Sequence, residues 1–175
     1  ISNEINAIQR FYNIYNKRML DHNADESYFF EKEYFDKIGL LNENFWKVIE
    51  IYNDTKIIGG AIILQNRNYC NIHLSSSLKE FFKLSPNVII RDAIIKYCLD
   101  NSIKVLHFGG GRTNQLNDSL LNFKKKFSKD LIDYNLGGII FNEKVYLNFC
   151  LNWEKKNSKD PKKKKFTNYF LKYRY

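Results

Sequence analysis

The stretch of the chain from position 105 to position 127 joins residue types that bind anions. An apolar run is followed by Gly109, Gly110 and Gly111, and Arg112 comes next. Three glycines allow a backbone to approach a ligand closely and to turn its N–H groups toward an anion, and arginine has the planar fork that suits phosphate or carboxylate. The pattern matches neither GxGxxG nor GxxxxGK[ST]. We interpret this loop as a substrate-binding element, with a flexible strand-to-helix connection as the alternative.

Lys124 follows this loop and stands next to an aromatic helix face. Phe123 and Phe127 are four residues apart, so a helix would place both on one side, with Lys124 at the edge. A lysine in that place can hold an anionic group or stabilise a developing oxyanion. Lys124 also begins a run of three lysines, and such runs are usually solvated. By composition alone, the solvated interpretation is favoured.

A strand expected over residues 69–75 supplies a candidate general base. Strict alternation would place His73 and Ser75 on one face, and Ile72 and Leu74 on the other. An imidazole titrates near neutral pH and can remove a proton from an amine. Histidines without a catalytic role are commoner, so a bystander role for His73 stays open.

The loop that begins at Ser75 and Ser76 and reaches Asn87 joins this strand to a helix. Free backbone N–H groups at a strand end and at a helix N-terminus suit a pyrophosphate or an acyl carbonyl. The loop lacks the Arg/Gln-x-x-Gly-x-Gly/Ala pattern typical of acetyl-CoA-binding enzymes. His107, directly before the three glycines, is a further candidate for substrate binding or for a hydrogen bond to the loop.

Other chemistries find little support in the residues. No paired acidic dyad, HExxH, GxSxG or Cys–His signature is present. The three cysteines, Cys70, Cys98 and Cys150, are an odd number without metal-ligand spacing, so we expect no metal, no disulfide framework and a reducing cytoplasm. No apolar run approaches about 18 residues, so no transmembrane segment is expected.

The formal net charge of +9 raises the question of nucleic acid. Much of the charge lies in two lysine runs, Lys124 to Lys126 and Lys162 to Lys165. The second run, beside Asp160 and Pro161, is interpreted first as a solvated linker and second as a basic arm for RNA or a membrane surface.

Hydrophobic spacing predicts the elements that must position these side chains. The predicted order is two helices, a meander of three strands, and then helix, strand, helix, strand and helix. A meander followed by a crossover helix gives an α+β protein with a mixed, mostly antiparallel sheet and helices on both faces. We expect a domain over residues 1–154 and a basic, aromatic tail over 155–175. The predicted helices cover 3–22, 31–41, 85–99, 119–127 and 142–153, and the predicted strands 46–52, 56–64, 69–75, 103–108 and 131–141.

The segment HFGGGRTNQLNDSLLNFKKKFS resembles the C-terminal signature of FemAB-like acyltransferases of the GNAT (N-acetyltransferase) superfamily. In that family a GGG loop ends a strand and a DSL-x-x-FK-x-x-F helix follows. The stretches FY at 11–12, IGGA at 58–61, HLS at 73–75 and SPN at 85–87 resemble other parts of the family pattern. The matching positions of the signature are Phe108, Gly109, Gly110, Gly111, Asp118, Ser119, Leu120, Phe123, Lys124 and Phe127.

The resemblance implies a GNAT fold and transfer of an acyl or aminoacyl group to an amine of a cell-envelope precursor, such as a peptidoglycan stem peptide or a surface glycan. It implies acyl-CoA or aminoacyl-tRNA as the co-substrate, no tightly bound cofactor, tRNA as a potential partner, and an N-terminal GNAT domain that these residues do not include. It also implies that Lys124 lies at the reaction centre with Phe123 beside it. Two alternatives remain: an acyl-CoA-dependent N-acyltransferase of a nucleotide-linked amino sugar, with Arg112 on the diphosphate, and a non-catalytic RNA-binding module.

Overall fold

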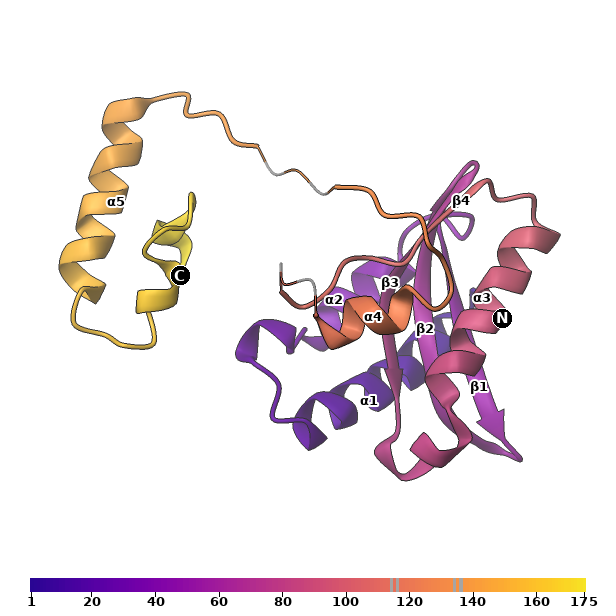
Figure 1. The fold of residues 1–175 in the computed structure, drawn as a ribbon. Helices are drawn as coiled ribbons and strands as arrows, with labels where there is room; N and C mark the ends of the chain where they lie inside the picture. Colours follow the sequence, from indigo (N-terminus) through magenta and orange to yellow (C-terminus); the bar gives the residue numbers. More distant parts are fainter. Residues whose placement is uncertain (114, 116, 134, 136) are drawn as a thin grey trace. The chain divides into compact units, whose positions relative to one another are not determined.

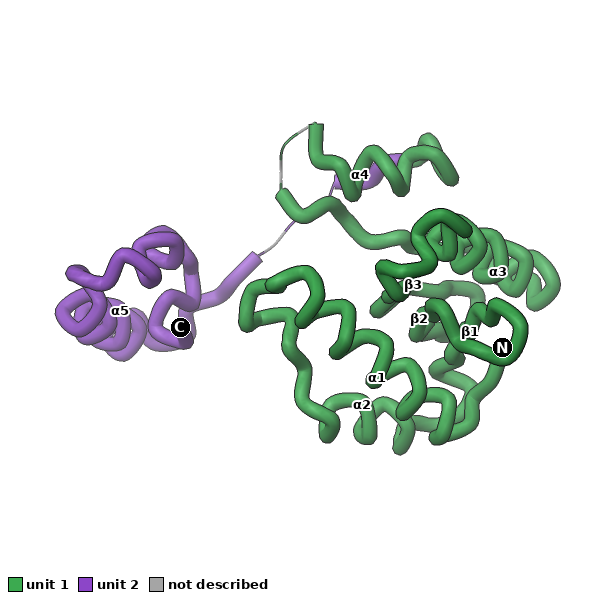
Figure 2. Tube along the Cα trace, turned by 90° about the horizontal axis from the view of Figure 1, so that it is seen from below, with its two compact units in different colours: residues 1–130 green, residues 131–175 purple. Residues whose placement is uncertain are grey.

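The computed structural model describes residues 1–113, 115, 117–133, 135 and 137–175. These residues form two compact units, residues 1–130 and residues 131–175, which Figure 2 distinguishes by colour. The predicted boundary between residues 154 and 155 concerns domains rather than these units, and it stays a prediction.

Unit 1 is built on a four-stranded mixed sheet with the strand order β1-β2-β3-β4 (Figure 1). The first three strands form the predicted antiparallel meander, and β4 pairs parallel to β3 after the crossover helix. The mixed, mostly antiparallel sheet is therefore confirmed. Its strands are β1 (Trp46–Asn53), β2 (Lys56–Asn66), β3 (Tyr69–Ser77) and β4 (Val105–His107).

Helices cover both faces of this sheet, as predicted, and Figure 2 shows the strands between them. Helices α1 (Ile5–Asp21) and α2 (Lys32–Gly39) lie on one face, and α3 (Pro86–Asp100) lies on the other. Their apolar residues recur at helical spacing and meet alternate residues of the strands. The buried core on the α1–α2 face consists of Ala7, Ile8, Phe11, Tyr15, Phe35, Ile38, Trp46, Val48 and Ile62. On the α3 face it consists of Ile49, Ala61, Ile63, Cys70, Ile72, Ile90, Ile94 and Cys98.

The paired glycines of β2 allow a close approach of backbone. A β-carbon added to Gly60 would lie 2.5 Å from the carbonyl oxygen of Ile49, which is closer than any real side chain comes. The register between β1 and β2 shifts directly beside them, between Ile51 and Tyr52. The pair therefore combines a close approach of backbone at Gly60 with a neighbouring irregularity in the register.

Strand β3 does not keep strict alternation, because it carries a bulge at His73. Ile62 of β2 pairs with Leu74 while Ile63 pairs with Ile72, so His73 is an extra residue without its own partner on β2. Leu74 consequently packs on the α1–α2 face whereas Ile72 packs on the α3 face. The prediction that Ile72 and Leu74 share a face is therefore wrong, since one extra residue exchanges the faces of all that follow.

Strands β3 and β4 pair over only three residues on each side, from Tyr69 to Asn71 and from Val105 to His107. Beyond Asn71, β3 continues to Ser77 along β2. The chain after β4 enters the glycine loop and then the short helix α4 (Ser119–Lys124), which ends three residues before the predicted helix end. Within the described residues, this leaves an open edge on the second half of β3.

Unit 2 contains α5 (Glu143–Asn157) and an aromatic C-terminal segment. The described residues of 131–141 form no strand, so the strand predicted there is wrong for them, while Tyr134 and Leu136 lie outside the described residues. No described helix combines the length and the apolar character needed to cross a membrane. Short 3-10 turns complete the chain at Glu26–Tyr28, Lys79–Leu84, Lys164–Phe166 and Lys172–Arg174.

Candidate functional site

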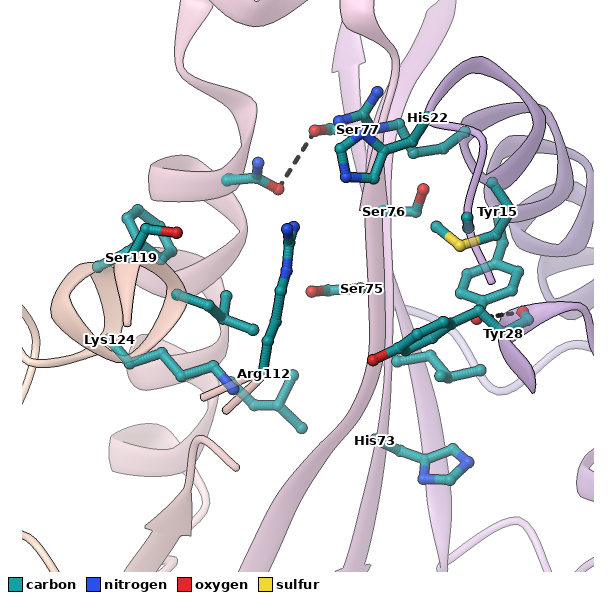
Figure 3. Close-up of a pocket in the computed structure, with 18 of the residues that line it drawn as sticks. Tyr15, His22, Tyr28, His73, Ser75, Ser76, Ser77, Arg112, Ser119 and Lys124 are labelled. Carbon is teal, nitrogen blue, oxygen red and sulfur yellow. Dashed lines mark hydrogen bonds between the residues drawn. The ribbon is translucent and has the colours of Figure 1, made fainter. Parts of the chain in front are cut away.

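A cavity of about 660 Å³ opens in unit 1 beside the second half of β3. Its walls come from the C-terminal end of α1 with the loop that follows, from β3, from the first turns of α3, and from the glycine loop and α4. This volume is in the range of small-molecule sites. Figure 3 shows β3 running through the middle, with Lys124 and Arg112 on one side of the strand and Tyr15 and Tyr28 on the other.

Asp118 holds the glycine loop and α4 together. One carboxylate oxygen accepts hydrogen bonds from the backbone N–H groups of Arg112 and Thr113, at 2.9 and 3.0 Å. The other oxygen accepts from the N–H of Leu121 at 2.8 Å and caps the helix. These hydrogen bonds, that of Leu121 above all, lower the pKa of Asp118. A β-carbon on Gly111 would lie 2.7 Å from the carboxylate, so glycine is required where the loop passes it.

Lys124 is positioned by the same loop. Its ammonium group donates a hydrogen bond to the carbonyl oxygen of Gly110 at 2.7 Å. A side chain on Gly109, which has a φ of +75°, would crowd that ammonium at 3.2 Å. Burial, and secondarily the charge of Arg91, lowers the pKa of Lys124. The lysine is therefore a half-buried cation in the cavity wall, and the solvated interpretation does not describe it.

Arg91 lies in the same wall and was not identified from the sequence. It projects from α3 toward β3 and is only 4% exposed. One guanidinium nitrogen donates to the hydroxyl of Ser75 at 2.9 Å. Burial lowers the pKa of Arg91 to about 10. The available signal was its spacing, since Asn87, Arg91, Ile94 and Cys98 recur at intervals of four, three and four on the inward side of α3.

The serines at the end of β3 line the cavity from different faces. The hydroxyl of Ser77 donates to the side-chain oxygen of Asn87 at 3.2 Å, which joins the strand end to the first turn of α3. The hydroxyl of Ser76 contacts the carbonyl of Ile14 on α1 at 3.5 Å. Ser75 faces Arg91 instead, so the three hydroxyls do not form one row.

His73 lines the same cavity but is turned toward the aromatic side. Its Nε2 shares a hydrogen bond with the hydroxyl of Tyr34 on α2. Figure 3 shows its ring on the side of β3 away from Lys124. Burial lowers the pKa of His73 below 6.5, so the neutral imidazole is the dominant form at pH 7.

The structure thus brings most of the candidate residues to one cavity. His107 is not among the lining residues; it is exposed and pairs with Asn71 at 2.9 Å. The three glycines also lie outside the lining and act by shaping the loop that holds Lys124. Lining residues that the sequence analysis missed include Tyr15, Arg18, His22, Tyr28 and Arg91. The candidates that do line the cavity are His73, Ser75, Ser76, Asn87, Arg112, Phe123 and Lys124.

The charge of the cavity is strongly asymmetric. Four cationic side chains line it, and Asp25 is the one carboxylate among the described lining residues. No group of three or more potential metal ligands occurs in the described part of the chain. Such a wall attracts anionic groups and stabilises negative charge that develops during a reaction. The four cations are Arg18, Arg91, Arg112 and Lys124.

Comparisons with known proteins agree with this architecture. The chain is similar in fold to a possible acetyltransferase from Clostridium difficile 630, with a TM-score of 0.59, 14% identity, and coverage of 80% of this chain and 95% of that chain. It is also similar to the aminoglycoside acetyltransferase meta-AAC0020 from an uncultured soil metagenomic sample, solved with trehalose, with a TM-score of 0.54, 14% identity, and coverage of 79% and 91%. A comparison with curated proteins finds no match. The acetyltransferase (GNAT) domain family matches residues 3–125, well over half of the chain, and the chain therefore belongs to the GNAT acetyltransferases and is an acyltransferase.

Proposed function

We propose that this acyltransferase is FemAB-like and transfers an acyl or aminoacyl group to an amine of a cell-envelope precursor. The observation that carries the proposal is the position of Lys124. Its half-buried ammonium is fixed to the glycine loop at Gly110 and lines a cavity beside the open edge of β3.

In the proposed reaction, the neutral acceptor amine attacks the carbonyl carbon of the donor. The C–N bond forms as the carbonyl oxygen becomes an oxyanion, and collapse of that intermediate expels the thiolate or ribose oxygen. Lys124 stabilises the oxyanion or the leaving oxygen, because a cation in a partly dehydrated wall acts strongly on charge that develops near it. Alignment of the amine with the carbonyl supplies much of the remaining acceleration.

His73 is the proposed general base. Burial keeps its imidazole neutral at pH 7, which is the form that accepts a proton. His73 lines the cavity at the bulge of β3, on the side of the strand away from Lys124, and its Nε2 shares a hydrogen bond with Tyr34. A proton taken from the attacking amine would be held on this ring until it is released to solvent, and the leaving thiolate or ribose oxygen takes up a proton from solvent in turn.

The charge of the cavity favours an anionic substrate. Four cations and one carboxylate line it in the described residues, so a polycationic acceptor such as an aminoglycoside would be repelled. Envelope precursors carry phosphates and carboxylates, and acyl-CoA carries phosphates. GNAT acetyltransferases use acyl-CoA as co-substrate, and the open edge of β3 beyond Asn71 offers backbone groups to an extended donor.

A second candidate keeps the same chemistry and changes the acceptor to a nucleotide-linked amino sugar. Arg112 favours it, because this exposed side chain lines the cavity and extends between α4 and β3 in Figure 3, where it can meet a diphosphate. Both candidates place the reaction in the cytoplasm. The three buried cysteines are free thiols, which agrees with a reducing compartment. The proposal also includes tRNA and a preceding GNAT domain as partners, and a tail that begins at residue 155.

The test combines donor binding with turnover. Calorimetry measures binding of acetyl-CoA and of a charged tRNA, and mass spectrometry detects acylation of a nucleotide-linked muramyl peptide and of a nucleotide-linked amino sugar. Lys124→Ala and Arg112→Ala are compared with Lys126→Ala, an exposed lysine of the same run.

We expect one acceptor to be acylated, by a reaction that depends on Lys124 and not on Lys126. Product on the muramyl peptide supports the first candidate, and product on the amino sugar supports the second. Steeply salt-dependent tRNA binding without turnover on any acceptor would contradict both candidates. It would favour the RNA-binding alternative through Lys124 to Lys126 and Lys162 to Lys165.

A further inference from the structure

Arg91 is a buried cation whose hydrogen-bonding capacity is mostly unused. Its Nη2 donates to Ser75, while Nε and Nη1 have no hydrogen-bond partner among the described residues. Nε carries one N–H and Nη1 carries two, so at least three donors remain. Burying such a group at 4% exposure without partners costs stability. Arg91 is one of the residues that line the cavity, although Nε and Nη1 themselves are buried, so a ligand in the cavity would pair with them after a small turn of the side chain.

Lys124 lies close enough to Arg91 for their charges to oppose each other. The charge of Arg91 contributes to the lowered pKa of Lys124, after the larger effect of burial. Arg112 lines the same cavity. The one described lining carboxylate, Asp25, accepts hydrogen bonds from the backbone and hydroxyl of Ser27 on the far wall after α1. The carboxylate of Asp118 offsets part of the effect on Lys124. Two cations against this one carboxylate still leave a net positive charge.

We propose that Arg91 forms a subsite for a phosphoryl group of a substrate, to which Lys124 contributes one of its two remaining ammonium hydrogens while the other stays available to the reacting oxygen. The proposal rests on the acyl transfer proposed above, because it names one chemical group of a substrate in the same cavity. A phosphoryl group carries up to two negative charges and three acceptor oxygens. That matches two cations, three unused N–H donors on Arg91, and one further ammonium hydrogen of Lys124 beyond the one given to Gly110. A carboxylate would supply one charge and two oxygens.

The same reasoning separates a binding role from a structural one. A structural arginine stabilises the protein, so its replacement lowers the melting temperature. An unpaired cation held for a ligand destabilises the empty protein, so an apolar replacement of similar length raises the melting temperature and weakens ligand binding. The two roles therefore predict shifts of opposite sign.

The experiment uses Arg91→Met, Arg91→Lys and, as a matched control, Arg67→Met at the exposed turn between β2 and β3. Calorimetry measures the affinity for pyrophosphate, and thermal unfolding is followed with and without it. We expect Arg91→Met to bind pyrophosphate at least about thirtyfold more weakly, since it removes one partner of a buried charged contact. We expect the pyrophosphate affinity of Arg91→Lys to lie between those of Arg91→Met and the natural chain, and that of Arg67→Met to equal that of the natural chain.

Further titrations identify the source of the phosphoryl group. If it belongs to the donor, Arg91→Met loses affinity for CoA and keeps its affinity for pantetheine. If it belongs to the acceptor, the variant loses affinity for glucosamine 1-phosphate and keeps its affinity for CoA. Either result supports the subsite.

Three results would overturn it: unchanged pyrophosphate affinity in Arg91→Met, a lower melting temperature of the empty variant, or acetate binding as tightly as pyrophosphate. Pyrophosphate binding requires no turnover. If it depends on Arg91 while no acceptor is ever acylated, the proposed function fails and the subsite stands. If acylation is observed and does not change when Arg91 is replaced, the proposed function stands and the phosphoryl subsite fails.

Discussion

The two sides of β3 are built in opposite ways. On the α1–α2 side, aromatic rings pack against one another: Tyr34 lies 4.6 Å from Phe30 and 5.5 Å from Phe35 between ring centroids, and Tyr34 also pairs with His73. On the side of α3 and α4, Arg91 and Lys124 are cations with few partners. The first arrangement satisfies its own polar groups, and the second leaves buried donors of the cavity-lining Arg91 without partners among the described residues.

This difference indicates that one wall of the cavity mainly stabilises the fold and the other mainly serves binding and catalysis. A packed, satisfied wall stabilises the fold and gives His73 a fixed orientation. A wall with unsatisfied cations is costly in the empty protein and gains from a ligand or from charge that develops in a transition state. The cationic side is therefore expected to respond to mutation mainly in activity, and the aromatic side mainly in stability.

Lys124→Ala tests this contrast with the largest expected effect. Removing a preorganised cation that faces a developing oxyanion should lower kcat/KM by about 10²–10³-fold, with a melting temperature close to that of the natural chain. Steady-state acylation assays measure the change, and Lys126→Ala is the control. Normal turnover by Lys124→Ala would remove the lysine from the proposed chemistry.

Asp118→Ala tests the same contrast in another way, because it should displace the ammonium group of Lys124 without removing it. The carboxylate accepts hydrogen bonds from Arg112, Thr113 and Leu121, so its loss should loosen both the glycine loop and the start of α4. We expect kcat to fall about tenfold or more because Lys124 is displaced from its productive position, and we expect a smaller change in KM. Asp118→Asn, which keeps one acceptor oxygen, should recover part of the activity. Equal kcat in all three proteins would show that the loop is not a positioning element.

Arg91→Met tests whether the two cations act on each other. Since a nearby positive charge disfavours protonation, removing it should raise the pKa of Lys124 toward 10.5. An NMR titration of the lysine ammonium measures this shift, and Arg67→Met is the matched control. A Lys124 pKa that does not move would mean that the two side chains are electrostatically independent.

His73→Gln should produce the smallest effect on stability, in addition to the loss of activity expected when the proposed general base is removed. The folded protein lowers the pKa of His73, so between 6.5 and that lower value the unfolded chain binds more protons. The stability associated with the neutral ring is complete above pH 6.5 and is lost as the pH falls below it.

We therefore expect the difference in melting temperature between pH 7.5 and pH 5.5 to be smaller in His73→Gln than in the natural chain. His22→Gln, at the exposed end of α1, is the control. If the two variants show the same pH dependence as the natural chain, burial of His73 does not contribute. The proposed role of general base requires kcat to fall in His73→Gln as well, and an unchanged kcat would remove His73 from the proposed chemistry.

The sequence by itself determined the elements and the loop chemistry. Apolar spacing defined the meander and the three long helices of the described fold, because burial enforces periods of 2 and 3.6 residues. The GGG loop was recognisable because glycine is the residue type that allows such a close approach of backbone. The strand predicted over 131–141 is wrong for the described residues of that range, because an apolar run does not pair unless the fold offers it an edge.

Only the tertiary structure decided which side chains face one another. The bulge at His73 reversed the faces of β3, and no local pattern announced it, since a bulge depends on the register with the neighbouring strand. Whether Lys124 is solvated or half-buried depended on the approach of the glycine loop, which composition does not encode. Arg91 occupies an apolar position of its helix, and its candidate role in binding follows only from the positions of Ser75 and Lys124 beside it. A charge becomes functional through the distance and burial of its neighbours, and those are properties of the folded chain.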